Sequence, residues 1–176
     1  MKRYATMLAA VALALLLLQE TGSAQFAKGK NYIGAHVGLS GLGSTFTFGG
    51  DFERGITEKI GPGVIGVGAT VDFWSYNFDY AFVTGDYSYK YLSIGLLGNY
   101  HYILQDKKWD PWAGLVLGYY IVSVKTPVGS FTGFDGSRLY LGMQLGCRYA
   151  LNDQFDLQAR LGFGPYIVAV GADFKF

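Results

Sequence analysis

The sequence predicts an all-β protein, an eight-stranded antiparallel up-and-down transmembrane β-barrel that follows an export leader. Three observations support this prediction. Apolar residues alternate with glycine or polar residues in eight separate segments, which is the period of a strand with two different faces. Glycine occurs 26 times, about twice its usual share, and aromatic residues make up 17% of the chain. After the leader, no apolar run reaches the ~18 residues of a membrane-spanning helix.

The N-terminus has the three-part layout of a secretory signal peptide. Lys2 and Arg3 precede an unbroken apolar run of 12 residues, 7–18, and small residues follow up to Ala24. The run is too short to anchor the chain in a bilayer, so we expect cleavage after Ala24. The alternative is a buried helix of the mature domain. The predicted division is a cleaved signal peptide over 1–24 and a barrel domain over 25–176.

Charge and cysteine content argue against nucleic-acid binding and against a structural metal site. The chain has 14 Lys and Arg and 13 Asp and Glu residues, and losing Lys2, Arg3 and Glu20 with the leader removes the net charge. A neutral chain has no electrostatic attraction for a phosphate backbone. The single cysteine, Cys147, permits neither an internal disulfide nor a cysteine-based zinc site. No cofactor is therefore expected.

The first four predicted strands place apolar residues on one face, opposite glycine or polar residues. Such strict alternation indicates strands rather than helices. The apolar faces are Ile33, Ala35, Val37 and Leu39 in 31–39; Phe46, Phe48 and Phe52 in 45–56; Ile65, Val67, Ala69, Val71 and Phe73 in 64–73; and Leu92, Ile94, Leu96, Tyr100 and Tyr102 in 87–104.

The last four predicted strands follow the same rule. Their apolar faces are Leu115, Leu117, Tyr119 and Ile121 in 112–122; Leu139, Leu141, Met143, Leu145, Cys147 and Tyr149 in 138–150; Leu157, Ala159, Leu161 and Phe163 in 155–163; and Val168, Val170, Ala172, Phe174 and Phe176 at the C-terminus. Termini are usually frayed and polar, whereas this one is a finished amphipathic strand. In lipid every backbone group must be paired, so we expect the last strand to close the barrel on the first.

Three features favour a barrel whose apolar face meets lipid over a soluble barrel or sandwich. Glycines on the polar face suit a tight lumen beside bulky neighbours. Short polar turns at 59–61, 106–110 and 152–153 contrast with long connections at 75–86 and 123–136. Aromatic residues near strand ends are typical of interfacial girdles: Trp74, Tyr100, Tyr102, Trp109, Trp112, Tyr149, Tyr166 and Phe174.

The leader, the eight alternating strands and the terminal aromatic residue resemble the small outer-membrane β-barrels of Gram-negative bacteria, the OmpA/OmpX and opacity-protein type. The resemblance covers the whole mature chain. It implies a place in the bacterial outer membrane, with outer-membrane lipid, lipopolysaccharide and the barrel-assembly machinery as partners. It also implies that Phe174 and Phe176 form a C-terminal assembly signal. It leaves the function open, because this architecture serves many activities.

The polar faces predict a lumen filled with paired charges. Acids and bases are nearly equal in number there, which favours a plugged interior over a wide pore, because unpaired buried charge is costly. We expect Arg148 opposite Asp156 and Asp156 opposite Asp173, as a structural network and not a proton-transfer site. The predicted lumen residues are His36, Asp51, Glu53, Asp72, Asn99, His101, Arg138, Gln144, Arg148, Asp156, Arg160, Asp173 and Lys175.

An aromatic ribbon is predicted around the connection 75–86. Before the connection, apolar residues are at odd positions up to Phe73 and at even positions from Trp74 on. After it, they are at odd positions up to Tyr91 and at even positions from Leu92 on. We expect a β-bulge in each strand at the outer membrane edge. The ribbon would offer a stacking surface and a free strand edge to an extracellular ligand or host surface; the alternative is a loop with incidental aromatics. Its residues are Trp74, Tyr76, Phe78, Tyr80, Tyr87 and Tyr89.

The sequence shows no catalytic constellation. The stretch 61–66 matches the glycine-rich dinucleotide motif, but a turn precedes it and a strand, not a helix, follows. His36 and His101 have no third metal ligand nearby, so we expect hydrogen-bonded lumen residues. The prediction is a non-enzymatic protein for surface interaction, adhesion or envelope integrity. The alternative is a narrow channel or transporter for ions or small hydrophobic molecules.

Overall fold

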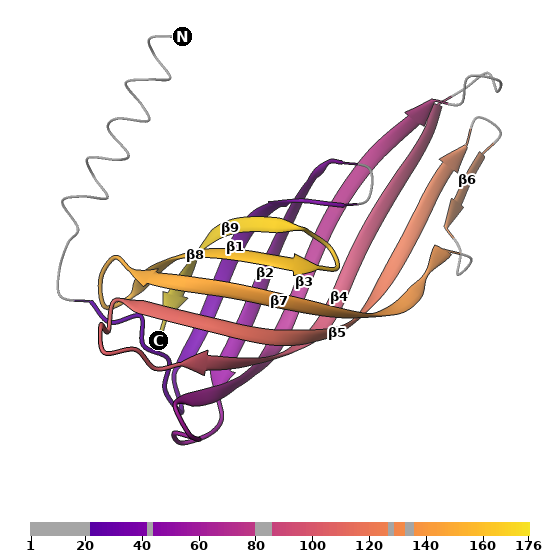
Figure 1. The fold of residues 1–176 in the computed structure, drawn as a ribbon. Helices are drawn as coiled ribbons and strands as arrows, with labels where there is room; N and C mark the ends of the chain where they lie inside the picture. Colours follow the sequence, from indigo (N-terminus) through magenta and orange to yellow (C-terminus); the bar gives the residue numbers. More distant parts are fainter. Residues whose placement is uncertain (1–21, 42–43, 80–85, 127–128, 133–135) are drawn as a thin grey trace, which may run out of the picture.

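The computed structural model describes residues 22–41, 44–79, 86–126, 129–132 and 136–176, and these form an antiparallel β-barrel (Figure 1). Within these residues, neighbours pair in the order β4-β3-β2-β1-β9-β8-β7-β5, and β5 pairs back to β4, which closes the ring. β6 pairs with the far end of β5. The predicted eight-stranded up-and-down barrel is confirmed. The strands are β1 (Asn31–Leu39), β2 (Phe46–Gly55), β3 (Gly63–Asp79), β4 (Asp86–Tyr102), β5 (Trp109–Thr126), β6 (Gly129–Thr132), β7 (Arg138–Ala150), β8 (Phe155–Phe163) and β9 (Val168–Lys175).

The last strand closes the barrel on the first, as its alternation predicts. β9 pairs with β1 from Tyr32↔Lys175 to Leu39↔Val168. Beyond that ladder, the Asn31 amide donates to the Phe176 carbonyl at 3.0 Å, and the Phe176 amide donates back at 3.1 Å. The chain end is therefore sealed into the sheet. We call this end of the barrel the terminal end and the opposite end the distal end.

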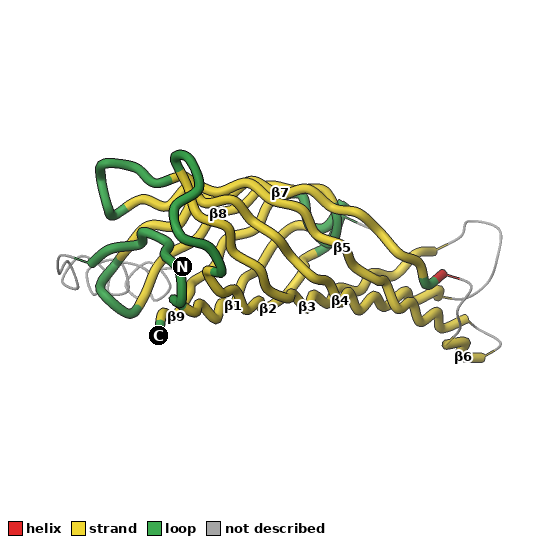
Figure 2. Tube along the Cα trace, turned by 90° about the horizontal axis from the view of Figure 1, so that it is seen from below, coloured by secondary structure: helices red, strands yellow, loops and turns green. Residues whose placement is uncertain are grey.

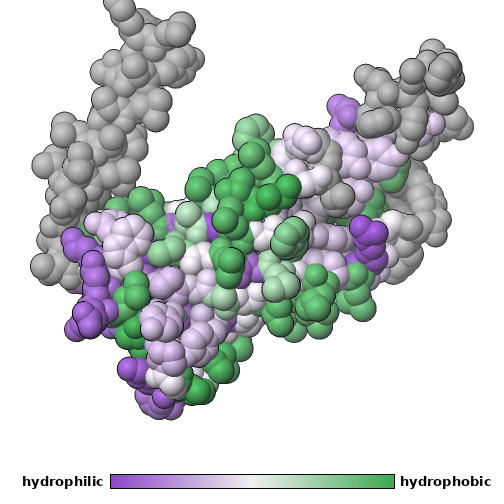
Figure 3. All heavy atoms as spheres, in the orientation of Figure 1, coloured by the Kyte–Doolittle hydropathy of each residue, from purple (hydrophilic) through white to green (hydrophobic). Residues whose placement is uncertain are grey.

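The distribution of apolar and polar side chains between the outside and the inside is the reverse of that in a soluble barrel. Large apolar residues such as Leu96 and Leu141 are 68% and 70% exposed on the outside, whereas the residues buried inside are mostly polar or charged. Figure 3 shows apolar side chains gathered on the outer surface over the middle of the barrel. An apolar outside and a polar inside are what a barrel in lipid requires. No helix among the described residues is long and apolar enough to cross a membrane.

The barrel wall is tall on one side and short on the other. β3, β4 and β5 have 17, 17 and 18 residues, whereas β1, β8 and β9 have 9, 9 and 8. The long strands extend far beyond the short ones, and β6 lies at the distal end, opposite the C-terminus (Figures 1 and 2). The predicted loops at 75–86 and 123–136 are therefore partly wrong, because strand pairing continues into both.

The two predicted β-bulges are wrong. β3 and β4 pair without interruption from Gly63↔Tyr102 to Asp79↔Asp86, and β4 and β5 pair without interruption from Ser88↔Lys125 to His101↔Trp112. The phase change has another cause. From Trp74 onward the aromatic residues occupy the inner face, which below this point is polar, and the outward positions become polar.

The glycine-rich stretch 61–66 contains a tight turn and the start of β3. The Ile60 amide donates to the Gly63 carbonyl at 2.7 Å, and the Gly63 amide donates back at 3.2 Å. Gly61 has a φ of 61°, in the left-handed region that favours glycine. The motif thus serves the β2–β3 turn, and a strand follows it.

Candidate functional site: the filled lumen

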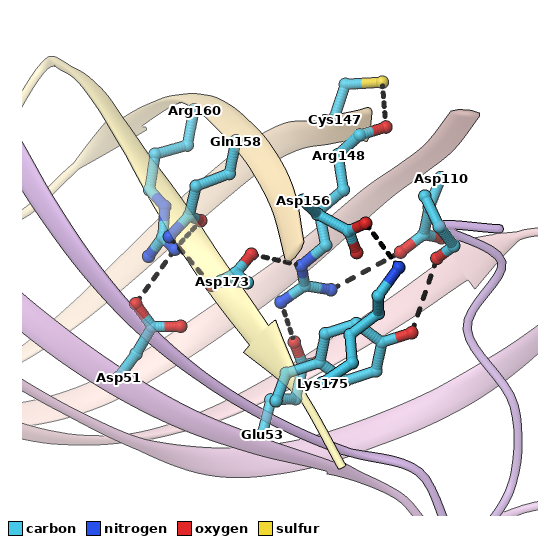
Figure 4. A network of polar contacts seen from close by, with 12 residues as sticks. Asp51, Glu53, Asp110, Cys147, Arg148, Asp156, Gln158, Arg160, Asp173 and Lys175 are labelled. Atoms are coloured by element: carbon cyan, nitrogen blue, oxygen red, sulfur yellow. Dashed lines mark hydrogen bonds and ion pairs between the residues drawn. The ribbon is translucent and has the colours of Figure 1, made fainter. Parts of the chain in front are cut away.

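The terminal half of the lumen is organised around Arg148 of β7, which is 1% exposed. Its Nε donates to Asp173 Oδ2 at 2.7 Å, its Nη2 to Glu53 Oε2 at 2.7 Å and its Nη1 to Asp110 Oδ2 at 3.4 Å (Figure 4). The ring of Tyr32 lies 4.7 Å from the guanidinium carbon. One cation from β7 thus joins carboxylates from β2, β5 and β9. A buried guanidinium needs this full set of partners to offset its lost hydration.

His101 lies beside Arg148 and joins two of the same carboxylates. Its Nε2 is 2.8 Å from Glu53 Oε1 and its Nδ1 is 2.9 Å from Asp110 Oδ2. Phe26, from the segment before β1, stacks on the imidazole with ring centroids 3.7 Å apart. Ionised carboxylates only accept hydrogen bonds, so both ring nitrogens must carry a proton for both contacts to form.

His36 forms a second group of the same kind, further along the lumen. Its Nδ1 is 3.2 Å from Asp51 Oδ1 and its Nε2 is 2.8 Å from Asp72 Oδ1. Arg160 Nη2 donates to the same Asp51 oxygen at 3.0 Å. Gly49 pairs with His36 across the β1–β2 ladder, and a Cβ at Gly49 would collide with both the imidazole and the Asp72 carboxylate. The glycine therefore makes room for this group.

A chain of neutral groups connects the two histidine groups. Asn99 Nδ2 donates to Glu53 Oε1 at 2.8 Å, and Gln144 Nε2 donates to Asn99 Oδ1 at 3.0 Å. The Tyr166 hydroxyl donates to Gln144 Oε1 at 3.0 Å and accepts from Arg160 Nη1 at 3.3 Å. These bonds join the two histidine groups into one network.

At the terminal mouth, Lys175 Nζ donates to Asp156 Oδ1 at 2.6 Å (Figure 4). Asp156 pairs with Asp173 across the β8–β9 ladder, as expected. The expected pairing of Arg148 with Asp156 is wrong, because β7 pairs Arg148 with Gln158 and Ala150 with Asp156. The β7–β8 connection is longer than the assumed tight turn, which shifts the register by two residues.

The network holds more acids than fixed cations. Among the described residues, the buried cations with ion pairs are Arg148, Arg160 and Lys175. Six carboxylates share the interior with them, and the two doubly bonded histidines add two more positive charges if each holds two protons, which leaves one carboxylate in excess. The buried carboxylates are Asp51, Glu53, Asp72, Asp110, Asp156 and Asp173. No group of three side chains arranged to hold a metal ion occurs in the described part of the chain.

The structure places all of the predicted lumen residues except Arg138 inside the barrel. Arg138 is exposed at the distal end of β7, opposite Tyr120, and forms no ion pair with any described residue. The sequence pattern did not identify Asp110 or Tyr166 as lumen residues, whereas Gln158 lies on the polar face of the predicted strand 155–163 and is buried inside the barrel. The predicted fifth strand starts at residue 112, whereas β5 begins at Trp109, which puts Asp110 in the same inward phase as Trp112.

The distal half of the lumen is aromatic. Trp74 is fully buried and stacks on Tyr91 with centroids 4.9 Å apart, and its ring meets Tyr120 edge-on at 5.5 Å. Tyr76 stacks on Tyr89 at 5.1 Å. We call the following residues the aromatic cluster: Trp74, Tyr76, Tyr89, Tyr91, Tyr120 and Tyr140.

The predicted aromatic ribbon is therefore corrected in its orientation. Trp74, Tyr76 and Tyr89 face the inside of the barrel wall and stack within the aromatic cluster, rather than offering a free stacking surface. Tyr87 is half-buried. The side chain of Phe78 and the whole of Tyr80 lie outside the described residues.

The predicted girdle is also corrected. Trp74, Trp112 and Tyr166 are buried in the lumen. An outer aromatic belt does surround the terminal end, where Trp109 lies 4.7 Å from Tyr149 between ring centroids. In the same belt, Phe174 lies 5.3 Å from Phe155 and 5.9 Å from the exposed ring of Phe176. The aromatic residues thus divide between lumen filling and the outer belt.

No protein-family model matches the sequence, and no curated protein matches it. Solved structures do match the fold. A de novo designed transmembrane β-barrel is 12% identical with a TM-score of 0.54, covering 86% of this chain and 99% of the design. Ail of Yersinia pestis, in complex with the heparin analogue sucrose octasulfate, is 14% identical with a TM-score of 0.53, covering 85% and 99%.

The N-terminal β-barrel domain of Pseudomonas aeruginosa OprF is 15% identical, with a TM-score of 0.50, and the match covers 85% of this chain and 98% of that domain. Identities this low carry no role from one protein to another. The likeness concerns the fold, and it confirms the resemblance to small eight-stranded outer-membrane barrels. The chain folds as a small, closed transmembrane β-barrel.

Proposed function

We propose that the protein is a non-enzymatic outer-membrane barrel that acts in surface interaction through the part of its sheet that projects beyond the lipid. One observation carries the proposal. On the outer face, the cross-strand row Phe73, Leu92, Ile121 is followed directly by Ser75, Lys90, Ser123. Lipid-facing positions need apolar side chains, so the membrane edge lies between these two rows. We call the part beyond it the distal sheet: 75–79 of β3, 86–90 of β4, 123–126 of β5, and β6.

The distal sheet has a strand edge suited to a partner. The β2–β3 ladder ends at Thr47↔Trp74, so the stretch 75–79 has β4 on one side and no described strand on the other. A strand edge of this kind is a place where an extended peptide can add to a sheet. This edge supports a role in interaction.

The filled lumen argues against the alternative function, a narrow channel. Arg148, His101 and the amide chain block the terminal half, and the aromatic cluster fills the distal half. In planar bilayers, the purified barrel should give no regular conductance steps. Steady single-channel currents from the folded protein would favour the channel instead.

A sulfated sugar is a suitable first probe for the interaction. Ail, a barrel of the same fold, is in complex with the heparin analogue sucrose octasulfate. On this chain, Lys90, Lys125 and Arg138 are exposed at or near the distal sheet. Changing all three to Gln removes three positive charges and should weaken sucrose octasulfate binding about tenfold. The measurement is made in low salt, where the attraction between exposed charges is least screened. Lys28→Gln, at the terminal end, is the matched control and should bind as wild type does; no binding by the wild type would remove this ligand class.

The terminal aromatics offer a separate test of membrane assembly. We propose that Phe174 and Phe176 are read during insertion, and that the protein reaches the outer membrane by this route. Phe176→Ala keeps the backbone bonds to Asn31 and removes only the exposed ring. It should slow the appearance of heat-modifiable barrel in a pulse–chase experiment, whereas Phe155→Ala, in the same belt, should not. Equal rates for the two variants would argue against an assembly role for the terminal ring.

A further inference from the structure

The β8–β9 hairpin has an apolar tip that differs from the rest of the distal rim. The stretch 161–168 contains no charged residue. On its outer side, Phe163 is 80% exposed and Ile167 is 56% exposed. On its inner side, the Tyr166 hydroxyl donates to Gln144, and the Pro165 carbonyl accepts from Thr47 Oγ1 at 3.0 Å. The polar groups of the tip thus turn inward, and only apolar surface faces out.

The tip also ends lower on the wall than the strands of the tall side. β8 and β9 have 9 and 8 residues, against 17 in β4. On the tall wall, the outer face turns polar at Lys90, but the short wall has no such polar row before the chain reverses. Large apolar side chains exposed beside strands that face lipid are stable in hydrocarbon and not in water. The tip therefore sits inside the apolar layer.

Beside this tip, the outer surface of β5, β7 and β8 contains a groove of about 520 Å³. A groove of this size is within the range of ligand sites, ~300–1,000 Å³. Its floor is formed by residues with small side chains or none. These are Ala113 of β5, which pairs with Leu145 of β7, and Gly162 of β8, which pairs with Gln144. The larger lining side chains are Leu115, Met143, Leu145, Leu161, Phe163 and Ile167.

Very little space lies behind the groove. A second space behind it, lined by Val116, Pro165 and Tyr166 among others, measures only about 10 Å³, which is about the room that one water molecule needs. The one polar side chain of the lining, Gln144, is buried and already bonded to Asn99 and Tyr166. An occupant of the groove therefore meets apolar surface and no free polar side chain.

We propose that this groove at the β7–β8 seam binds one acyl chain of a membrane lipid. The groove faces the lipid, its lining is apolar, and the submerged tip bounds it at the distal end. An unbranched hydrocarbon chain is the occupant that needs no hydrogen-bond partner and is present on that surface at all times. A polar ligand has nothing to bind there. The proposal is independent of the proposed surface interaction, which uses the distal sheet.

Photolabelling in vesicles tests this proposal. The full barrel is reconstituted in phosphatidylcholine carrying a diazirine on one acyl chain, and adducts are mapped by peptide mass spectrometry. We expect labelling at Met143, Leu161 and Phe163 at least threefold above that at Leu96 and Leu117, which are similarly exposed outer residues. Labelling spread evenly over all five positions would show ordinary annular lipid and overturn the proposal.

Two variants sharpen the test. Ala113→Phe fills the floor of the groove and should remove the enrichment. Ala69→Phe places the same ring on an outward alanine of β3, away from the groove, and should leave the enrichment unchanged. Equal loss in both variants would overturn the proposal, as would a dimer whose interface protects the groove from the label, because the occupant would then be a second copy of the chain. If Ala113→Phe does not fold, Ala113→Val fills part of the same floor, and the wild-type labelling pattern is decisive without either variant.

Discussion

The terminal half of the lumen is lined by all eight strands of the ring and the distal half by β3, β4, β5 and β7, and the two halves are filled in opposite ways. The terminal half holds Arg148, two histidines and six carboxylates, whereas the distal half holds the aromatic cluster. The outer face changes at the same height, from apolar at Leu92 to polar at Lys90. At each height along the barrel, one of the two faces of the wall, outer or inner, is therefore apolar. On the terminal side of the membrane edge, lipid covers the apolar outer face. Beyond the edge, the apolar residues are on the inner face and pack on one another, as in the core of a water-soluble protein.

The two halves should therefore respond differently to mutation. Buried charges depend on complete pairing, because one missing partner leaves the others uncompensated. Stacked rings contribute mainly through burial and contact, so removing one ring costs its own share and the neighbours can partly close the gap.

Arg148→Ala should have the largest effect. Glu53, Asp110 and Asp173 would lose their common cation in a dry site. Breaking a buried pair costs about 3–5 kcal/mol, and the barrel should unfold at much lower urea concentration, measured as loss of heat-modifiable migration. A change below about 1 kcal/mol would mean that water reaches the site.

Two double variants test which carboxylates pair with Arg148. Adding Asp173→Asn to Arg148→Ala should recover part of the lost free energy of unfolding, because it removes one uncompensated charge. Adding Asp156→Ala should recover nothing, because the carboxylate of Asp156 is bonded to Lys175 instead. The opposite ranking of the two double variants would contradict the register of β7 and β8.

The sequence predicted the barrel, its closure and most of its lumen because a period of two is set by the strand itself. His36, Glu53 and Arg160 could be assigned to the interior by counting along one strand. Partners across strands depend also on the length of the connection. The pairing of Asp156 with Asp173 was predicted correctly, whereas two residues more in the β7–β8 turn moved Arg148 from Asp156 to Gln158.

The phase change near Phe73 could not be interpreted from the pattern alone. A bulge and a swap of environments produce the same shift in a sequence. The polar outward residues Ser75 and Asn77, together with Lys90, were the available evidence for the swap. Tyr166 was missed for a different reason: it lies in a turn, where alternation says nothing about direction, and the hairpin tip bends it into the lumen.

Trp74→Ala should have the second-largest effect. The ring is fully buried and contacts Tyr91 and Tyr120, and replacing a buried Trp by Ala costs about 3 kcal/mol when the site can partly collapse. The barrel should still insert and remain heat-modifiable, because the terminal network is untouched. A variant that fails to insert would show that the aromatic cluster is needed for assembly and not only for stability.

The smallest effect is expected where the distal half contains a polar pair. Ser93 Oγ and the Tyr140 hydroxyl are 2.8 Å apart, and Ser93 is fully buried. Tyr140→Phe leaves Ser93 without this partner and should cost about 1 kcal/mol. Adding Ser93→Ala removes both members of the pair, and the double variant should lie within about 0.5 kcal/mol of wild type, because two matched apolar replacements leave no buried group unsatisfied. Urea titration of the two single variants and the double variant measures this cycle. Costs that simply add would show that the hydroxyls belong to a wider network like that of Arg148, and the contrast between a charged half that needs every partner and an aromatic half that tolerates loss would then be wrong at this position.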